Sequence, residues 1–214
     1  MAQRPAFFPK FDSIGVETRS FEFTWSPGFA PSQKRKNVVA LHEAITASRR
    51  ECRPLEISRR SLDDAGVRMS AFNLMLPISG AQCSVESVFQ ASKVFEFSGP
   101  HPEQYPNPPR DVRAFVKENA RGSLTAFDIN GTRWPLRPTT AFYDWLYLKA
   151  LASNPDLAGA LASYGCFTDI EFNPEKSLNC QAYAAALYRS LAHAGKLDEA
   201  LSSQEAFLQF HPKN

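Results

Sequence analysis

The spacing of hydrophobic and polar residues changes several times along the chain, and each change marks a predicted element. Aromatic residues alternate with polar ones near the start, at Phe21, Phe23 and Trp25 against Glu22 and Thr24. This two-residue period is typical of a strand, because successive side chains point to opposite faces. We expect the strand to end at the turn signal Ser26-Pro27-Gly28.

The apolar period then lengthens to three and four residues. After Pro31-Ser32, the apolar residues Val38, Leu41 and Ile45 fall on one face, which predicts a helix. Two short apolar segments follow between Leu55 and Leu76, on either side of Asp64-Ala65-Gly66. This pattern predicts a strand, a turn and a second strand.

The stretch Ser84 to Phe97, SVESVFQASKVFEF, predicts another helix. Its apolar side is formed by Val85, Val88, Phe89 and Phe95. Gly99-Pro100 is expected to end this helix, because proline cannot continue it. Residues 99–110 hold five prolines, so we expect an irregular loop there.

The second half of the chain predicts a hairpin and more helices. Asn130-Gly131 suits the two positive φ angles of a tight turn between strands within Leu124 to Leu136. Thr140 to Ala152 is apolar nearly all round and predicts a buried helix, interrupted only by Asp144 and Lys149. Helices over 178–194 and 197–210 complete an α+β fold, mainly helical, with short strands and a hairpin.

Composition narrows the class of protein. A chain of 214 residues with 43% hydrophobic residues can bury one sizeable core, and no linker divides it. The net charge of +2 is too small to indicate a nucleic-acid binder, although it does not exclude one. The N-terminus lacks the apolar core of a signal peptide, and no run approaches the ~18 apolar residues of a membrane span. We therefore expect a cytoplasmic protein with no membrane partner.

The cysteines indicate neither a metal site nor a redox motif. Four occur, at Cys52, Cys83, Cys166 and Cys180, without a CxxC pair or a matching histidine pair. We expect buried, reduced thiols and no bound metal.

Two polar features carry candidate chemistry. Glu86, Gln90 and Lys93 are spaced by four and three residues, and at about 100° per residue they form one stripe on a helix. A solvated helix edge would show the same spacing, so the pattern alone leaves both interpretations open. The second feature is the cluster Lys34 to Lys36 at the opening of the first helix, where cations oppose the helix dipole. It is either a solvated face or a surface for an anionic partner.

The stripe belongs to the pattern E-x-x-x-Q-A-x-K, which resembles the signature of the NADAR family, proteins associated with NAD and ADP-ribose metabolism. Two further elements match in order: Ser70-Ala71-Phe72-Asn73 upstream, and FTDIEFNPEKSLNCQA downstream, with Asp169 and Asn179. The phrases SAFNL and TAFYDWLYLKAL resemble more closely the antitoxins that accompany DNA guanine ADP-ribosyltransferase toxins. That branch has an N-terminal extension like residues 1–54, which we expect to pack on a NADAR-like catalytic domain over 55–214.

The resemblance implies N-glycosidic hydrolysis that removes ADP-ribose from guanine bases in DNA, without a cofactor. A ribose on an exocyclic amine is a glycosylamine, which opens to an imine when its ring oxygen is protonated. Lys93 would then attack C1 and form a Schiff base, with Glu86 as proton donor and acceptor. This lysine must be neutral, so it needs an apolar wall, for which Val88, Phe89 and Val94 are candidates. A route in which Glu86 or Asp169 activates water stays open.

The remaining candidates are expected substrate contacts. They are Gln90, Ser70, Phe72, Asn73, Trp145, Asp144, Lys176, Ser177 and Asn179. Gln90 would orient a ribose hydroxyl, and Lys176-Ser177 at a helix start would suit a pyrophosphate. Structural interpretations stand beside these: an Asx turn or a first-turn dipole partner at Asp169, a helix cap at Asn179, a hydrogen bond to backbone at Asp144 and a core position for Trp145.

The expected partners are ADP-ribosylated DNA, ADP-ribose and the cognate toxin. Two other functions remain as alternatives. One is a small-molecule N-glycosidase that acts on ribosylamine intermediates of the riboflavin pathway, against which stand the N-terminal extension and the lack of a glycine-rich loop around Asp169. The other is a non-catalytic antitoxin that binds and masks its toxin. A hydrolase would rescue at substoichiometric amounts, whereas a masking protein would need one copy per toxin.

Overall fold

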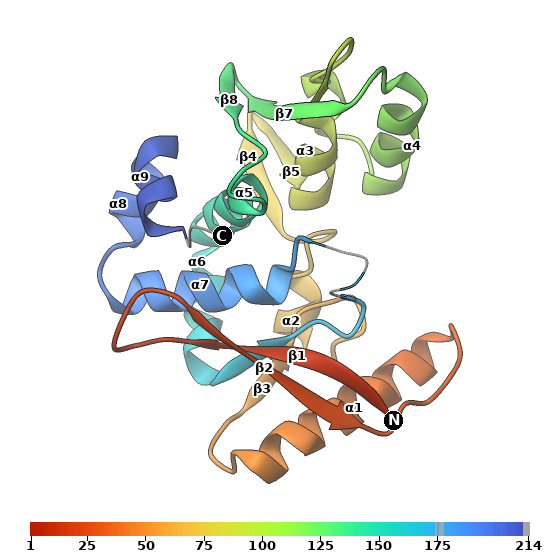
Figure 1. Cartoon of the computed structure of the whole chain (residues 1–214), viewed down its shortest axis with the longest axis vertical. Coiled ribbons are helices and arrows are strands. Elements are labelled where there is room, and N and C mark those ends of the chain that lie inside the picture. The colour runs from red at the N-terminus through yellow and green to blue at the C-terminus, as the bar shows by residue number, and fades with distance from the viewer. Residues whose placement is uncertain (174, 176–177, 212–214) are drawn as a thin grey trace. The chain divides into compact units, whose positions relative to one another are not determined.

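The computed structural model describes residues 1–173, 175 and 178–211. Within them the chain forms helices together with three small sheets, which confirms the predicted α+β class (Figure 1). The chain folds into two compact units, each built from two segments. Unit 1 comprises Met1–Ser70 and Pro155–Glu199, and unit 2 comprises Ala71–Asn154 and Ala200–Asn214. The predicted division into an extension over 1–54 and a catalytic domain over 55–214 stays a prediction.

Unit 1 is organised around a four-stranded sheet with the strand order β2-β1-β9-β3. Its strands are β1 Ala2–Pro9, β2 Val16–Phe23, β3 Pro54–Glu56 and β9 Cys166–Thr168. β1 pairs antiparallel with both β2 and β9, while β3 runs parallel to β9. The predicted strand through Phe21 and Phe23 is thus confirmed as β2.

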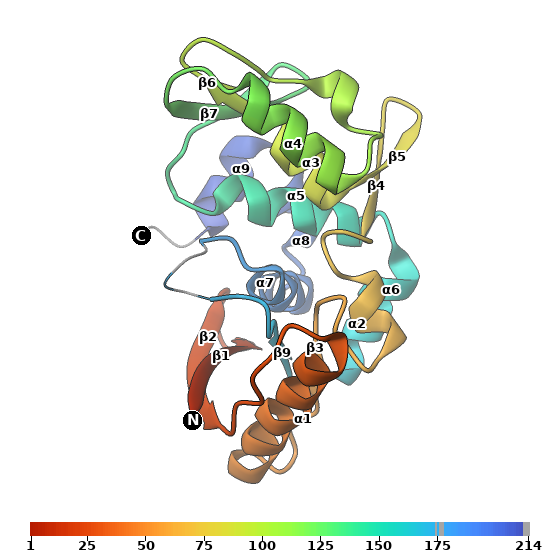
Figure 2. The same cartoon turned by 90° about the vertical axis from the view of Figure 1, so that its right-hand side faces the viewer.

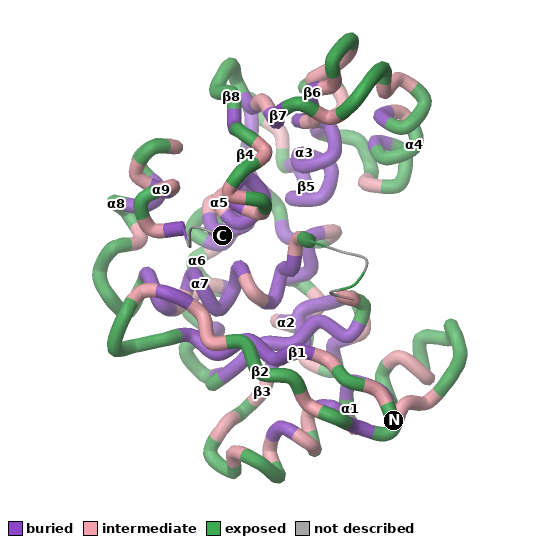
Figure 3. Tube along the Cα trace, viewed as in Figure 1, coloured by how far each residue is buried: buried purple, intermediate pink, exposed green. Residues whose placement is uncertain are grey.

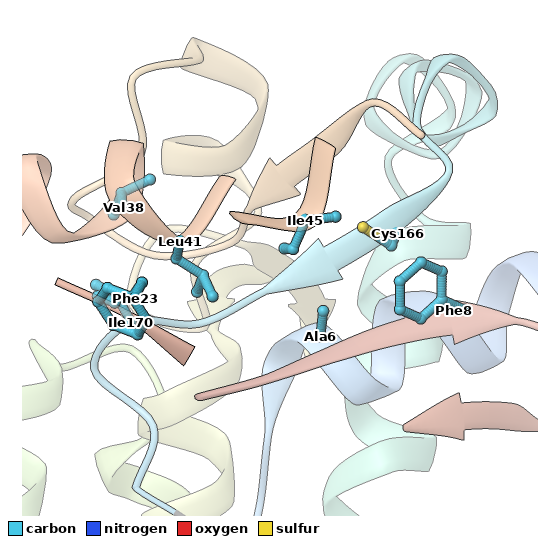
Figure 4. Packing of buried hydrophobic residues seen from close by; sticks show 8 residues of the cluster. All are labelled: Ala6, Phe8, Phe23, Val38, Leu41, Ile45, Cys166 and Ile170. Atoms are coloured by element: carbon cyan, nitrogen blue, oxygen red, sulfur yellow. The ribbon is translucent and has the colours of Figure 1, made fainter. Parts of the chain in front are cut away.

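Helices cover both faces of this sheet. Ala6 and Phe8 of β1 pack with Leu41 and Ile45 of α1, Pro31–Ser48, in the core that Figure 4 shows. Phe7, between them in the strand, meets Tyr183 of α7, Gln181–His193, edge to face with 5.9 Å between ring centroids. The alternation of β1 therefore places α1 and α7 on opposite faces, and the predicted helix after Pro31-Ser32 is confirmed.

The predicted turn around Gly66 is wrong, because these residues form the short helix α2, Asp64–Arg68. The side chain of Asp63 caps this helix by accepting a hydrogen bond from the Ala65 backbone N–H at 3.0 Å. A Cβ on Gly66 would lie 2.0 Å from the backbone oxygen of Glu56. The glycine is needed because the helix passes so close to the end of β3, and not because the chain turns there.

Unit 2 contains the other two sheets and the helices between them. Its elements up to residue 154 are β4 Met75–Ile78, β5 Ala81–Ser84, α3 Val85–Ala91, β6 Lys93–Phe95, η1 Pro102–Gln104, α4 Pro109–Asn119, β7 Leu124–Ile129, β8 Thr132–Trp134 and α5 Ala141–Ala152. β4 pairs with β5, and β6, β7 and β8 form the third sheet. The predicted hairpin is confirmed, with φ of 52° at Asn130 and 81° at Gly131. The predicted buried helix is confirmed as α5.

The helix predicted from Ser84 to Phe97 is only half as long as expected. It ends at Ala91, and the next residues form β6, where Lys93 pairs with Phe127 of β7. The carbonyl of Ser92 accepts a hydrogen bond from the Asp128 N–H at 2.7 Å, so sheet pairing replaces the next helical turn. Gly99 therefore does not end the helix as predicted. Its φ of 76° brings the chain back against Lys93 instead.

The proline-rich segment is more ordered than predicted. It contains η1, and its last proline opens α4, because proline suits the first position of a helix. Figure 2 shows α4 beside α3. The helix predicted over 197–210 is two helices, α8 Leu197–Ser202 and α9 Gln204–Phe210, because the Ser203 side chain caps the second at the Ala206 N–H.

The remaining short elements of unit 1 are α6 Pro155–Ala160 and η2 Leu161–Ser163. Figure 3 shows that α5 and α7 are buried over most of their lengths. No described helix combines the length and apolar character that spanning a membrane requires.

The four cysteines are free thiols; Cys83, Cys166 and Cys180 are buried as predicted, whereas Cys52 is half-buried. The Sγ atoms of Cys52 and Cys166 lie 3.2 Å apart.

Candidate functional site

Glu86, Gln90 and Lys93 are linked by hydrogen bonds in unit 2. The Lys93 Nζ donates to Gln90 Oε1 at 2.6 Å, and the Gln90 Nε2 donates to Glu86 Oε1 at 3.0 Å. Glu86 and Gln90 are buried and Lys93 is half-buried, so this is not a solvated helix edge. The amide of Gln90 therefore holds the carboxylate and the amine at a fixed separation.

Arg113 of α4 completes the cluster. Its Nη2 donates to Glu86 Oε1 at 2.6 Å, and its side chain is 61% exposed whereas that of Glu86 is 9% exposed. A buried carboxylate is strongly destabilised without a partner, and Arg113 supplies one. Sequence reasoning missed Arg113 because the contact depends on how α4 packs on α3. The four-residue spacing of Val112 and Val116, both buried, was the signal that a helix lies there.

Lys93 has the surroundings that a nucleophilic amine needs. Its Nζ lies 5.4 Å from the centre of the Phe89 ring, so Phe89 provides the predicted apolar wall. Burial lowers the pKa of Lys93; the carboxylate of Glu86 opposes this shift, and the cation of Arg113 adds to it. A lower pKa increases the neutral fraction of the amine at neutral pH. Because a neutral amine that donates one N–H to Gln90 keeps its lone pair, it can still attack an electrophile.

The Ser70 to Asn73 segment lies at the start of α3. The backbone N–H of Glu86 donates to the carbonyl of Ala71 at 2.9 Å. Phe72 is half-buried and Asn73 is exposed, both in unit 2, while Ser70 is buried at the end of unit 1. The backbone of this segment thus contacts the first turn of α3, and the roles of Ser70, Phe72 and Asn73 in substrate binding stay predictions.

Asp169 follows β9 in unit 1 and is buried. Its Oδ1 accepts the backbone N–H groups of Glu171 and Phe172 at 3.0 and 3.2 Å, which is the Asx turn weighed above. Its Oδ2 accepts the side-chain amide of Gln181, the first residue of α7, at 3.0 Å. Burial and the neighbouring carboxyl of Glu56 raise the pKa of Asp169 to about 8. This shift favours the protonated form of the carboxyl, which suits Asp169 to donate a proton.

Glu56 is a buried acid that sequence reasoning missed. It lies at the end of β3 and accepts hydrogen bonds from the hydroxyls of Ser58 and Thr168, both at 2.6 Å, and from the Ile170 N–H at 2.8 Å. Burial raises the pKa of Glu56. Because Ile170 directly follows Asp169, Glu56 fixes the backbone on which Asp169 is carried. A single acid in a short apolar strand gives no signal of this role.

His42 extends this network from α1. Its Nε2 lies 2.9 Å from the Thr168 hydroxyl oxygen, and since that hydroxyl donates to Glu56, the histidine is the donor. Burial lowers the pKa of His42 to about 4, so the ring is neutral at neutral pH.

Two neighbouring candidate residues, the buried Asp144 and the half-buried Trp145, lie on α5 in unit 2. Asp144 is fully buried, and its Oδ2 bonds to the Thr140 hydroxyl at 2.6 Å and to the His211 Nε2 at 2.9 Å. The ring of Trp145 contacts that of Trp134 in a tilted arrangement, with 4.9 Å between centroids and 41° between planes. The partners of Asp144 are side chains and not the expected backbone group, and Trp145 is only half-buried. The roles of both residues as substrate contacts stay predictions.

A model of the family of DarT1-associated NADAR antitoxins matches residues 2–214 of the chain. The chain belongs to this family. The resemblance drawn from the Glu86, Gln90 and Lys93 motif is therefore confirmed, and it extends to the N-terminal residues. A search among curated proteins found no match.

Three predicted contacts of this NADAR antitoxin fall on the segment before α7. Lys176 and Ser177 lie outside the described residues, so their proposed pyrophosphate contacts stay predictions. Asn179 is half-buried and precedes Cys180, which is the N-cap of α7; the alternative of Asn179 as the cap is therefore wrong. Among the residues that the structure describes, no group of three or more His, Cys, Asp or Glu side chains could hold a metal ion.

Proposed function

We propose that this NADAR antitoxin is an N-glycosidic hydrolase that removes ADP-ribose from guanine bases in DNA and so reverses the modification made by its toxin. The observation that carries the proposal is the series of hydrogen bonds that links Lys93, Gln90, Glu86 and Arg113. It pairs a half-buried amine of lowered pKa with a buried carboxylate whose Oε1 accepts hydrogen bonds from Gln90 and Arg113. The family match supports the antitoxin role.

The chemistry proceeds through an imine. Protonation of the ribose ring oxygen opens the glycosylamine to an iminium ion between C1 and the guanine amine. The neutral Lys93 adds to C1 and forms a C–N bond; a proton moves from Lys93 to the guanine nitrogen, and the C1–guanine bond breaks. Guanine leaves with its amine restored, and C1 stays bound to Lys93 as a Schiff base.

Water then completes the cycle. Its oxygen adds to C1 of the Schiff base, the C1–Lys93 bond breaks, and the released ADP-ribose closes its ring. Glu86 is the proposed proton acceptor and donor in these steps, and Arg113 and Gln90 fix the geometry of its carboxylate. In the competing route water attacks C1 directly and Glu86 or Asp169 assists. The raised pKa of Asp169 suits a proton donor better than a base.

The test is the reaction itself. Guanine-ADP-ribosylated oligonucleotide is incubated with purified protein, and both products are identified by mass spectrometry. We expect free ADP-ribose and an oligonucleotide with the mass of the unmodified sequence. Release of guanine from the DNA, or no product at all, would contradict the proposal. Activity confined to small ribosylamines would instead favour the small-molecule glycosidase.

A further inference from the structure

Among the residues that the structure describes, the cluster of cations at the start of α1 has no ion-pair partner. Between Glu22 and Glu43 the cationic side chains are Lys34, Arg35 and Lys36, and no acid lies among them. Arg35 and Lys36 are exposed, and among the described residues none of the three has an acidic partner. Cations at a helix N-terminus weaken the helix, since they oppose its dipole. Helix stability therefore does not account for the cluster.

The loop before α1 is held in place and presents an aromatic ring to solvent. The buried amide of Asn37 accepts the Ser26 N–H at 2.7 Å and donates to the Ser26 carbonyl at 2.9 Å. Phe29, three residues further on, is 95% exposed. Folding normally places phenylalanine inside, so a fully exposed ring on an anchored loop indicates a contact surface.

One further cation, Arg4, and a hollow adjoin this surface. The Arg4 guanidinium and the Lys34 ammonium lie 5.3 and 5.4 Å from the centre of the Trp25 ring. A shallow hollow of about 730 Å³ runs along α1 and is lined by Pro31, Ser32, Arg35, Lys36, Val39, Ala40 and Glu43. The hollow therefore has an apolar floor, with the cations Arg35 and Lys36 and one acid, Glu43, in its lining. We call Phe29, Lys34, Arg35 and Lys36 the α1 cationic surface.

We propose that the α1 cationic surface binds the backbone of single-stranded DNA, with Phe29 stacked on a base. This rests on the proposed function, because a DNA substrate supplies the phosphates that complement the unpaired cations. Unpaired cations and an exposed aromatic ring are the two components of sequence-independent single-strand binding. The ring favours a single strand, since bases in a duplex are already stacked on one another.

The experiment uses unmodified DNA, so it requires no catalysis. Binding of a fluorescent single-stranded oligonucleotide to the full chain is measured by anisotropy at several salt concentrations. Lys34→Ala/Arg35→Ala/Lys36→Ala should weaken binding about 10- to 50-fold and reduce the slope of log K against log salt by about 2, as for three lost phosphate contacts. Phe29→Ala should weaken binding at least about fivefold with an unchanged slope, because it removes stacking and no charge.

A matched variant removes the same charge elsewhere. Lys10→Ala/Arg50→Ala/Lys117→Ala replaces three exposed cations outside the surface and should retain most of the affinity and slope. Thermal melts of all variants establish that each is folded. Equal losses in both triple variants would mean that net charge alone matters, and would overturn the proposal. Unchanged DNA binding in the α1 variant would also overturn the proposal. If that variant had in addition lost binding to purified toxin, the surface would be a protein interface instead.

Separate experiments can refute the DNA-binding surface and the proposed reaction independently. Hydrolysis of ADP-ribosyl-guanosine by the wild-type protein tests the reaction without a DNA strand. If the nucleoside is hydrolysed but the wild-type protein does not bind unmodified single strands, the docking surface is wrong and the reaction stands. If unmodified strands bind through the α1 cationic surface and the nucleoside is not hydrolysed, the docking surface stands and the reaction is wrong.

Discussion

At the scale of single residues, the account depends on the protonation of Lys93. Burial beside Phe89 lowers the pKa of Lys93, while Gln90 fixes the direction of its Nζ. Lysine and arginine differ in the property that matters here, because a guanidinium stays protonated and cannot form an imine. Replacing Lys93 with arginine therefore separates the role of the amine as a nucleophile from the role of its positive charge.

Lys93→Arg is expected to abolish turnover and covalent trapping together. Borohydride added during turnover should reduce the imine to a secondary amine, which leaves ADP-ribose attached to the wild-type protein at Lys93. Peptide mass spectrometry locates the adduct. Lys117→Arg, at an exposed position, is the control and should form the same borohydride-reduced adduct at Lys93 as the wild-type protein. If the active wild-type protein forms no covalent adduct with ADP-ribose and Lys93→Arg is also active, the Schiff-base route is wrong. The water-activation route would then remain.

Glu86→Gln is expected to reduce turnover at least ~100-fold, because the amide neither accepts nor donates the proton. The change conserves shape, so Gln90 keeps an acceptor at this position and thermal unfolding should shift little. Steady-state kinetics on modified oligonucleotide provide the measurement, with the exposed Glu118→Gln as control. Turnover near the wild-type rate would remove Glu86 from the mechanism.

Asp169 predicts a pH dependence of stability. Its pKa is raised to about 8 in the folded state, so the folded protein binds more protons than the unfolded chain between about pH 4 and pH 8. The free energy of unfolding should therefore fall as pH rises through this window, by up to about 1.4 kcal/mol per pH unit. Urea titrations at several pH values should show a shallower fall for Asp169→Asn and the wild-type slope for the exposed Asp156→Asn. Identical slopes in all three proteins would refute the raised pKa.

At the scale of elements, the sequence predicted which side chains lie close together better than it predicted where the helices end. The spacing of Glu86, Gln90 and Lys93 correctly indicated one cluster, although Lys93 lies on β6 and not on the helix. Four- and three-residue spacings within one segment keep side chains close even where the helix ends. The end itself depended on Ser92 bonding to Asp128, a partner 36 residues away that no local pattern reveals. The same holds for Arg113, whose contact with Glu86 arises from helix packing.

Gly99→Ala tests how β6 positions Lys93. Gly99 has a φ of 76°, and a Cβ there would lie 2.4 Å from the Lys93 carbonyl oxygen. Gly131→Ala is the matched control, because its φ is 81° and no heavy atom lies within 4 Å of the added Cβ. Both substitutions introduce backbone strain of about 1–2 kcal/mol, and only the first adds a collision. Gly99→Ala should be the less stable protein in urea titrations and the less active; equal effects would mean that the collision is relieved freely.

At the scale of the whole molecule, each unit is assembled from segments far apart in the sequence. β9 joins β1 and β3 in one sheet although more than a hundred residues separate it from either. Periodicity predicted most of the elements but not this pairing, which depends on contacts distant along the chain. Glu56 illustrates the consequence, since its role became visible only when Thr168 and Ile170 were seen beside it.

The central claim is that this antitoxin acts as a catalyst on modified DNA, and turnover in the absence of toxin tests it most directly. Purified protein is mixed with a hundredfold molar excess of guanine-ADP-ribosylated oligonucleotide, and released ADP-ribose is quantified over time. We predict many equivalents of ADP-ribose per protein and full restoration of the guanine. Release of no more than one equivalent, or restoration that requires equimolar protein and toxin, would contradict the account and identify a masking antitoxin.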